Sequence, residues 1–239
     1  MSVIPVSDAV GMVIAGDMDC AEMKEFLCEA ARRREAEDPA LAAVLSKDKP
    51  LAEGIDAAAV LKRNGLPHIS TGFRRFLREK RAAPDPACVR DGHAFLFRGD
   101  YPGLGGKGIY SYAYARYHAS LDQMLALLEG EGIICDFSFT PRNKLEDLMN
   151  LQSKGGYEPF VSATAKFETA TIHPKYEEAD GVVYVVRVPL QHAFRNYAST
   201  IVNRSREGEV LVADYVSPDE ILAAIKPSPG MHVDVRDFM

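Results

Sequence analysis

Two glutamates, Glu207 and Glu209, stand two residues apart directly before the apolar run 210–212. In extended backbone, residues i and i+2 project from the same face, so the sequence predicts that both carboxylates point the same way at the start of a strand. Two carboxylates held this close disfavour each other's charged form, which costs stability unless a cationic ligand or a reaction uses the pair. A solvated turn with ordinary surface glutamates is the alternative for this motif taken alone.

An arginine and a pair of hydroxyl residues lie upstream, on two other segments with the pattern of strands. Arg98 ends the apolar segment 94–98, where a permanent charge is costly unless it meets an anion. Its planar guanidinium suits a phosphate or a carboxylate, and a structural ion pair is the alternative. Ser162 and Thr164 lie on the segment 159–164, with a single residue between them.

An arginine, a Ser-x-Thr strand and a Glu-x-Glu motif, in this order, resemble the ADP-ribosyltransferase family and in particular its cholera-toxin-like branch. The resemblance covers roughly residues 91 to 226. Ala163 departs from the Ser-Thr-Ser of that branch, whereas Thr164 keeps a hydroxyl at the third position. The resemblance implies an α+β domain of two small packed β-sheets with flanking helices. It also implies NAD as co-substrate without a metal, and mono-ADP-ribosylation of a protein on an exposed arginine.

The resemblance also implies a role for each matching residue. Arg98 would anchor NAD and brace the strands of the site, and the hydroxyl of Ser162 would orient the catalytic glutamate. Glu209 would be that glutamate, binding the ribose 2′-hydroxyl and stabilising an oxocarbenium-like transition state. Glu207 would position or deprotonate the acceptor arginine.

Two further residues are expected at the NAD site, and two other functions stay open. Thr164 adds a hydroxyl on the face of Ser162, and Phe167 could stack on nicotinamide or pack in the core. An NAD glycohydrolase, with water in place of arginine, is one alternative. A degenerate member that binds a partner protein is the other, and it is favoured by Ala163 and by a glycine-rich segment at 103–108 that could be a flexible turn or a phosphate cradle.

The elements that must position these residues fall into two parts. Residues 1–90 predict a helical layer, with a first helix ending near Asp38-Pro39 and others at 56–63 and 71–82. The proline-rich segment 82–86 marks a boundary, and residues 91–239 predict the catalytic α+β domain. The expected strands are 94–98, 133–139, 159–164, 182–188 and 209–213, and the expected helices are 121–129, 141–153 and 218–225.

Charge and composition limit the partners and the location. Residues 91–239 carry the whole net charge of −6, which disfavours nucleic acid and suits a basic protein partner. No apolar run reaches the roughly 18 residues of a membrane span, and the first residues lack a Sec signal pattern. We therefore expect a cytoplasmic protein, or one secreted without a cleaved Sec signal, such as a bacterial toxin or effector delivered into a host cell.

Overall fold

The computed structural model describes residues 20–46, 51–66, 83–118, 149, 160–172, 181–197 and 208–239. The helices are α2 (Cys20–Glu37), α3 (Pro39–Leu45), α4 (Ala57–Arg63), α5 (Tyr112–Tyr117) and α8 (Phe167–Ile172). The strands are β1 (Val89–Arg90), β2 (His93–Asp100), β3 (Ile109–Tyr110), β4 (Phe160–Thr164), β5 (Val182–Pro189), β6 (Ala193–Arg195), β7 (Glu209–Ala213), β8 (Tyr215–Val216) and β9 (Ile221–Ile225). The class is α+β, as expected.

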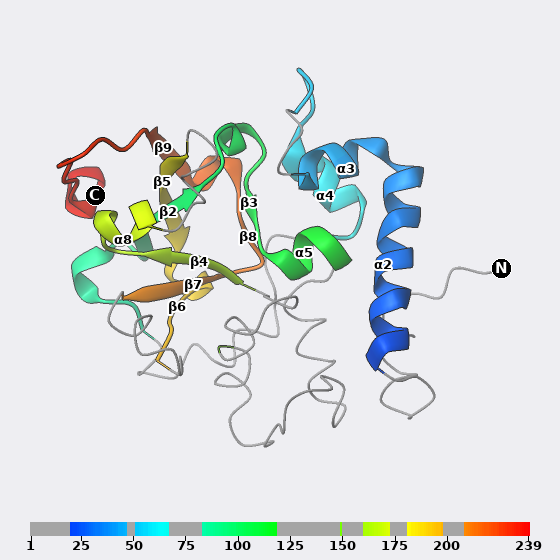
Figure 1. The fold of residues 1–239 in the computed structure, drawn as a ribbon, viewed down its shortest axis with the longest axis horizontal. Helices are drawn as coiled ribbons and strands as arrows, with labels where there is room; N and C mark the ends of the chain where they lie inside the picture. The colour runs from blue at the N-terminus through cyan, green and yellow to red at the C-terminus, as the bar shows by residue number, and fades with distance from the viewer. Residues whose placement is uncertain are drawn as a thin grey trace.

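A largely buried antiparallel sheet forms the centre of the strand-rich part (Figure 1). Its strands run in the order β6-β7-β4-β2-β5-β9, with β1 paired to β2, and β3 pairs with β8 in a separate two-stranded sheet. β5 is the apolar run predicted at 182–188, and it pairs with β2 over the full length of both strands. Valine suits such a strand because its branched side chain packs well on a pleated surface.

The four strands predicted at 94–98, 159–164, 182–188 and 209–213 are confirmed as β2, β4, β5 and β7. The helix predicted at 218–225 is wrong beyond its first turn. Ser217 and Glu220 do form the capping box, but the helical turn they start ends at Glu220. Residues 221–225 continue as β9, the edge strand beside β5, with half-buried and exposed side chains in alternation. The alternation has the period of a strand and not of a helix.

The helical layer begins with α2, whose Leu27 and Ala31 are buried. α2 ends at Glu37, as predicted, but the chain starts a second helix, α3, at Pro39. Proline suits the first position of a helix because its missing N–H needs no partner there. Asp38 caps α3 by accepting from the N–H of Ala40. The same carboxylate accepts from Arg63 at 2.7 Å and from Asn64 at 2.7 Å, which ties the start of α3 to the end of α4.

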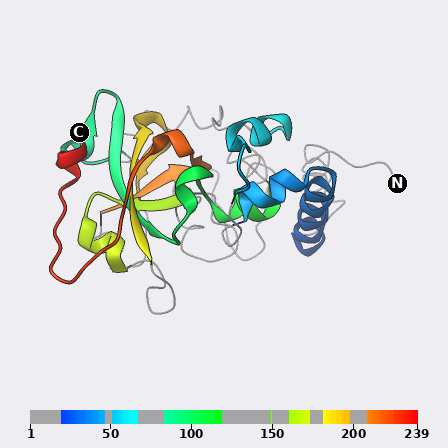
Figure 2. The same ribbon diagram turned by 90° about the horizontal axis from the view of Figure 1, so that it is seen from above.

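Three tyrosines connect the helical layer to the strands. Tyr110 of β3, Tyr114 of α5 and Tyr215 of β8 pack together in one cluster with buried side chains of α3 and α4. The buried hydroxyl of Tyr114 also donates to the carbonyl of Leu66 at 2.7 Å. Figures 1 and 2 show α5 between α2 and the strands, with the helical layer at the opposite end of the molecule from α8.

Some expected elements lie outside the described residues, namely the helices at 71–82, 121–129 and 141–153, apart from Met149, and the strand at 133–139. In the part of the chain that the structure describes, no helix combines the length and the apolar character needed to cross a membrane.

Candidate active site

One pocket gathers residues from β2, from the adjacent elements β4 and α8, and from β7, which are three separate regions of the sequence. Its empty space is about 300 Å³, part of it open to solvent. The lining residues are Phe97, Arg98 and Gly99 of β2, Ser162, Ala163 and Thr164 of β4, Thr169 and Ala170 of α8, and Glu209 of β7. The structure therefore brings together four of the residues that the sequence singled out: Arg98, Ser162, Thr164 and Glu209.

The register of the sheet explains why three of these residues, Ser162, Thr164 and Glu209, meet. Thr164 of β4 is paired with Glu209 of β7, and Ser162 is paired with Leu211. Residues directly opposite in an antiparallel pair share a face, and so do residues two apart on one strand. Ser162, Thr164 and Glu209 therefore lie on one face, with Ser162 as the diagonal neighbour of Glu209.

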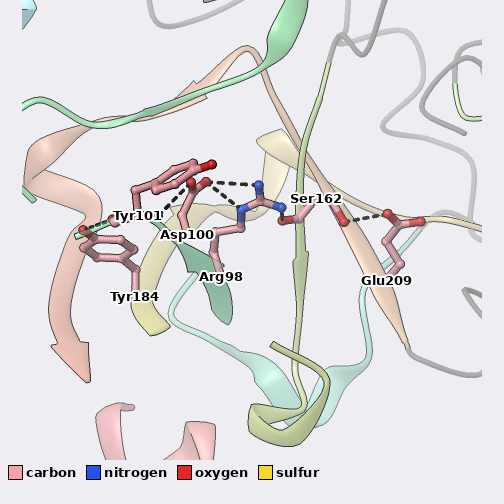
Figure 3. A network of polar contacts seen from close by, with 6 residues as sticks. All are labelled: Arg98, Asp100, Tyr101, Ser162, Tyr184 and Glu209. Carbon is pink, nitrogen blue, oxygen red and sulfur yellow. Dashed lines mark hydrogen bonds and ion pairs between the residues drawn. The ribbon is translucent and has the colours of Figure 1, made fainter. Parts of the chain in front are cut away.

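Arg98 connects β2 to β4 (Figure 3). Its Nη1 donates to the backbone carbonyl of Ser162 at 2.8 Å. Its Nε and Nη2 donate to Asp100 Oδ2 at 3.2 and 3.1 Å. The Asp100 side chain is 3% exposed, so its charge needs this partner, whereas that of Arg98 is 22% exposed. Of the five N–H donors of the guanidinium, these bonds use three, and the other two have no partner among the described residues.

Glu209 is nearly buried, at 5% exposed, and both of its carboxylate oxygens accept a hydrogen bond. The hydroxyl of Ser162 donates to Oε1 at 2.6 Å, as Figure 3 shows. The side-chain amide of Asn196 donates to Oε2 at 2.7 Å. Hydrogen bonds to an ionised acceptor are short and strong, so the carboxylate is held in one orientation by β4 on one side and by the end of β6 on the other.

Sequence reasoning missed Asn196. It follows β6 directly, and its backbone N–H donates to the Glu209 carbonyl at 2.9 Å, one step beyond the β6–β7 pairing of Arg195 with Val210. Only the register of β6 against β7 reveals that Asn196 is opposite Glu209. The sequence alone offered no signal for that register, since a long segment separates the two residues.

The predicted arrangement of Glu207 and Glu209 needs a correction. Glu207 lies outside the described residues. The residue between the two glutamates, Gly208, has a φ of +66°, which is the left-handed region and not extended backbone. Strand β7 begins only at Glu209. The rule that residues i and i+2 share a face requires extended backbone throughout, so it does not apply across Gly208.

Two other expected binding residues have definite places. Thr164 lines the pocket, and its hydroxyl accepts from the N–H of Lys166 at 3.1 Å, at the turn into α8. Phe167 is 1% exposed and packs edge to face on Phe97, with 5.5 Å between the ring centroids. Phe167 is therefore a core residue that fixes α8 against β2, while Thr169 and Ala170 of the same helix face the pocket.

The glycine-rich segment 103–108 is held against the sheet by Tyr184 of β5. The Tyr184 hydroxyl donates to the Tyr101 carbonyl at 2.7 Å (Figure 3). It also accepts from the Leu104 N–H at 2.9 Å. Burial raises the pKa of Tyr184, so this hydroxyl stays protonated and able to donate. The segment forms a short 3-10 helix at Leu104–Gly106, directly after the strand that carries Arg98.

Comparison of the chain with family models, with curated proteins and with solved structures found no match. Within the described ranges, no group of three histidine, cysteine, aspartate or glutamate side chains is arranged to hold a metal ion. The case for a function therefore comes from the pocket itself.

Proposed function

We propose that this protein is an NAD-dependent mono-ADP-ribosyltransferase that modifies a protein on arginine, with an ADP-ribosyltransferase-like fold. One observation carries the proposal: Ser162 donates to Glu209 at 2.6 Å, in a pocket that Arg98 also lines. This is the set of contacts that the resemblance to the family implies for an oriented catalytic glutamate. No single motif in the sequence required the three residues to meet.

The pocket suits one end of a dinucleotide. It combines polar groups with the apolar side chains of Phe97 and Ala170 and is partly open to solvent, so a ribosyl-nicotinamide group could enter it with the rest of the molecule outside. The two N–H donors of Arg98 that have no described partner could bind a phosphate or a ribose hydroxyl of NAD. The carboxylate of Glu209 in the same pocket is complementary to the positive charge that develops on the ribose.

The reaction breaks the bond between the ribose C1′ and the nicotinamide nitrogen, which leaves with the bonding electron pair as neutral nicotinamide. Positive charge then grows on the ribose, as in glycoside hydrolysis. Glu209 faces that charge from a nearly buried position, where a fixed carboxylate stabilises it more strongly than water does. Ser162 and Asn196 hold the carboxylate in place, so no reorganisation is needed as the charge develops.

The second half of the reaction forms a bond from C1′ to a guanidinium nitrogen of the acceptor, which loses a proton. A protonated guanidinium is a poor nucleophile, so an anion that orients it and accepts its proton has a chemical purpose. We propose Glu207 for this role. The acidic balance of residues 91–239 favours the approach of a basic protein.

The proposal separates the roles of the two glutamates, and labelled NAD tests that separation. With agmatine as a small arginine analogue, the wild-type protein should release nicotinamide and transfer ADP-ribose to agmatine. Glu207→Gln should lose transfer but keep part of the hydrolysis, because Glu209 and its two donors are unchanged. Equal loss of both activities in this variant would contradict the separation.

Two other results point to the alternative functions. Release of free ADP-ribose by the wild-type protein, without transfer to agmatine or to protein, would identify an NAD glycohydrolase on the same site. Absence of NAD binding up to millimolar concentration, measured by calorimetry, would identify a non-catalytic protein.

A further inference from the structure

We propose that Asn196 is a positioning residue that holds the carboxylate of Glu209 in its reactive orientation. This inference rests on the proposed function, and it adds a residue that the resemblance does not supply. The Nδ2 atom of Asn196 lies 2.7 Å from Glu209 Oε2, and the Asn196 side chain is 2% exposed. Asn196 is not among the pocket-lining residues, so it acts on the substrate only through Glu209.

Ser162 and Asn196 donate to different oxygens of the Glu209 carboxylate. Ser162 donates to Oε1 from the β4 side, and Asn196 donates to Oε2 from the β6 side. With one donor alone, the carboxylate could still rotate about its last bond, because torsions that end in a planar group have broad minima. Two donors on opposite sides fix the plane of the carboxylate as well as its direction.

The hydrogen bonds of Asn196 separate its role at Glu209 from a role in folding. Its backbone N–H continues the pairing of β6 with β7 by donating to the Glu209 carbonyl, and any residue except proline keeps that bond. Its side-chain oxygen is buried and accepts no hydrogen bond from any described residue. A buried amide with an unsatisfied oxygen costs stability, so the bond from Nδ2 to Glu209 is the evident use of this side chain.

The neutrality of the Asn196 side chain is as important as its position. A neutral amide donates to the carboxylate without adding a second charge, whereas an aspartate would place two carboxyl groups in contact. Two carboxyl groups at this distance share one proton and titrate as a pair. Ser162 and Thr164 of β4 lie on the same face as Glu209. Arg98, which lines the same pocket, is paired with Asp100.

The test measures steady-state hydrolysis of NAD by the full-length protein, because water is then the only acceptor and part of this activity is expected to remain without Glu207. In Asn196→Ala, kcat should fall roughly 10- to 100-fold, the effect of losing one hydrogen bond to a charged group. The KM for NAD should change by less than about threefold, because the pocket wall is intact. Arg195→Ala is the matched control: Arg195 is the exposed neighbour on the same strand, and its loss should leave kcat unchanged.

Asn196→Asp gives a readout that a purely structural role would not change. In the active form of this variant, the introduced aspartic acid and Glu209 share one proton, and the aspartic acid donates it in a hydrogen bond to ionised Glu209. As the pH rises this proton is lost, and the two negative charges repel. The kcat of Asn196→Asp should therefore fall toward alkaline pH, across a range in which the wild-type protein does not decline.

Each result has a distinct meaning. A kcat of Asn196→Ala within about threefold of wild type, or an unchanged pH profile in Asn196→Asp, would overturn the positioning role while leaving the proposed function intact. Failure of both variants to reach the wild-type melting temperature would assign Asn196 to folding and also overturn it. Absence of NAD cleavage by the wild-type protein would refute the proposed function itself.

Discussion

Glu209 shows how a nearly buried carboxylate is made compatible with a β-sheet. An isolated charge at 5% exposure would be costly, but each of its oxygens accepts a short hydrogen bond from a neutral donor. Arg98, the positive group that lines the same pocket, is paired with Asp100.

Removing the hydroxyl of Ser162 tests this arrangement at the residue scale. Ser162→Ala should lower kcat for nicotinamide release by roughly 10- to 100-fold, because one hydrogen bond to a charged group is lost. Thr171→Val is the matched control. Its hydroxyl donates to the Glu168 carbonyl at 2.7 Å, and Thr171 is not among the residues that line the pocket. Equal losses in the two variants would show that Ser162 has no special relation to Glu209.

The sequence allowed prediction of some site residues and not of others, for physical reasons. Arg98, Ser162 and Glu209 could be identified because each combines a functional side chain with a strand pattern and a characteristic order. Asn196 could not, because its role depends on strand register across a long connection. The shared face of Glu207 and Glu209 stays a prediction, since Glu207 lies outside the described residues. The extended backbone on which it rested is absent at Gly208, because a glycine permits a left-handed turn that a two-residue spacing does not reveal.

At the scale of elements, the contact between α2 and α5 depends on one buried histidine. His118 caps the end of α5 and is fully buried, with its Nε2 at 3.2 Å from Oε1 of Glu35 in α2. Burial lowers the pKa of His118 to about 4, and the charge of Arg34 acts in the same direction. The neutral ring can donate to Glu35 through Nε2–H.

This histidine predicts a pH dependence of stability. Because the pKa is lower in the folded state, the unfolded chain binds more protons between about pH 6.5 and pH 4. The stabilisation is fully present above pH 6.5 and is lost as the pH falls toward 4, with a slope approaching about 1.4 kcal/mol per pH unit. Urea unfolding at several pH values should show a smaller slope in His118→Asn, because asparagine binds no proton in this pH range. Asparagine is chosen because it tolerates the left-handed backbone found at this position.

His232→Asn is the control for this measurement, since His232 is 80% exposed and pairs with Glu168 at the surface. Between about pH 6.5 and pH 5.5 it should leave the slope as it is in the wild-type protein. At lower pH the comparison is not used, because the hydrogen bond from His232 lowers the pKa of Glu168. A His118→Asn variant with the wild-type slope would show that His118 does not titrate on unfolding.

Helices and strands could be predicted from the sequence where the apolar residues of a segment followed one clear pattern. The alternating or continuous apolar runs of β2, β4, β5 and β7 identify strands, and the caps at Asp56 and Asn64 delimit α4. Short elements were less predictable. α3 has seven residues and follows α2 after a single residue, so its own pattern is too brief to be distinguished. The segment 218–225 carries a valid capping box, but pairing with β5 decides its conformation after one turn.

At the scale of the whole molecule, the helical layer and the pocket are at different ends. Every residue that lines the pocket lies between positions 97 and 209, on β2, β4, β7 and α8. The helical layer packs on the tyrosine cluster of β3, α5 and β8 (Figures 1 and 2). The described helices of this layer, α2, α3 and α4, can therefore stabilise the strands or contact a partner without covering the site.

Cleavage of NAD is the central claim, and release of nicotinamide measures it most directly. The wild-type protein should release nicotinamide from NAD, and Glu209→Gln should do so roughly 100- to 1000-fold more slowly, since a fixed charge that stabilises the transition state is removed. Glu53→Gln, the same change at an exposed position of the helical layer, should match the wild type. No release by the wild-type protein, or equal release by Glu209→Gln, would contradict the account.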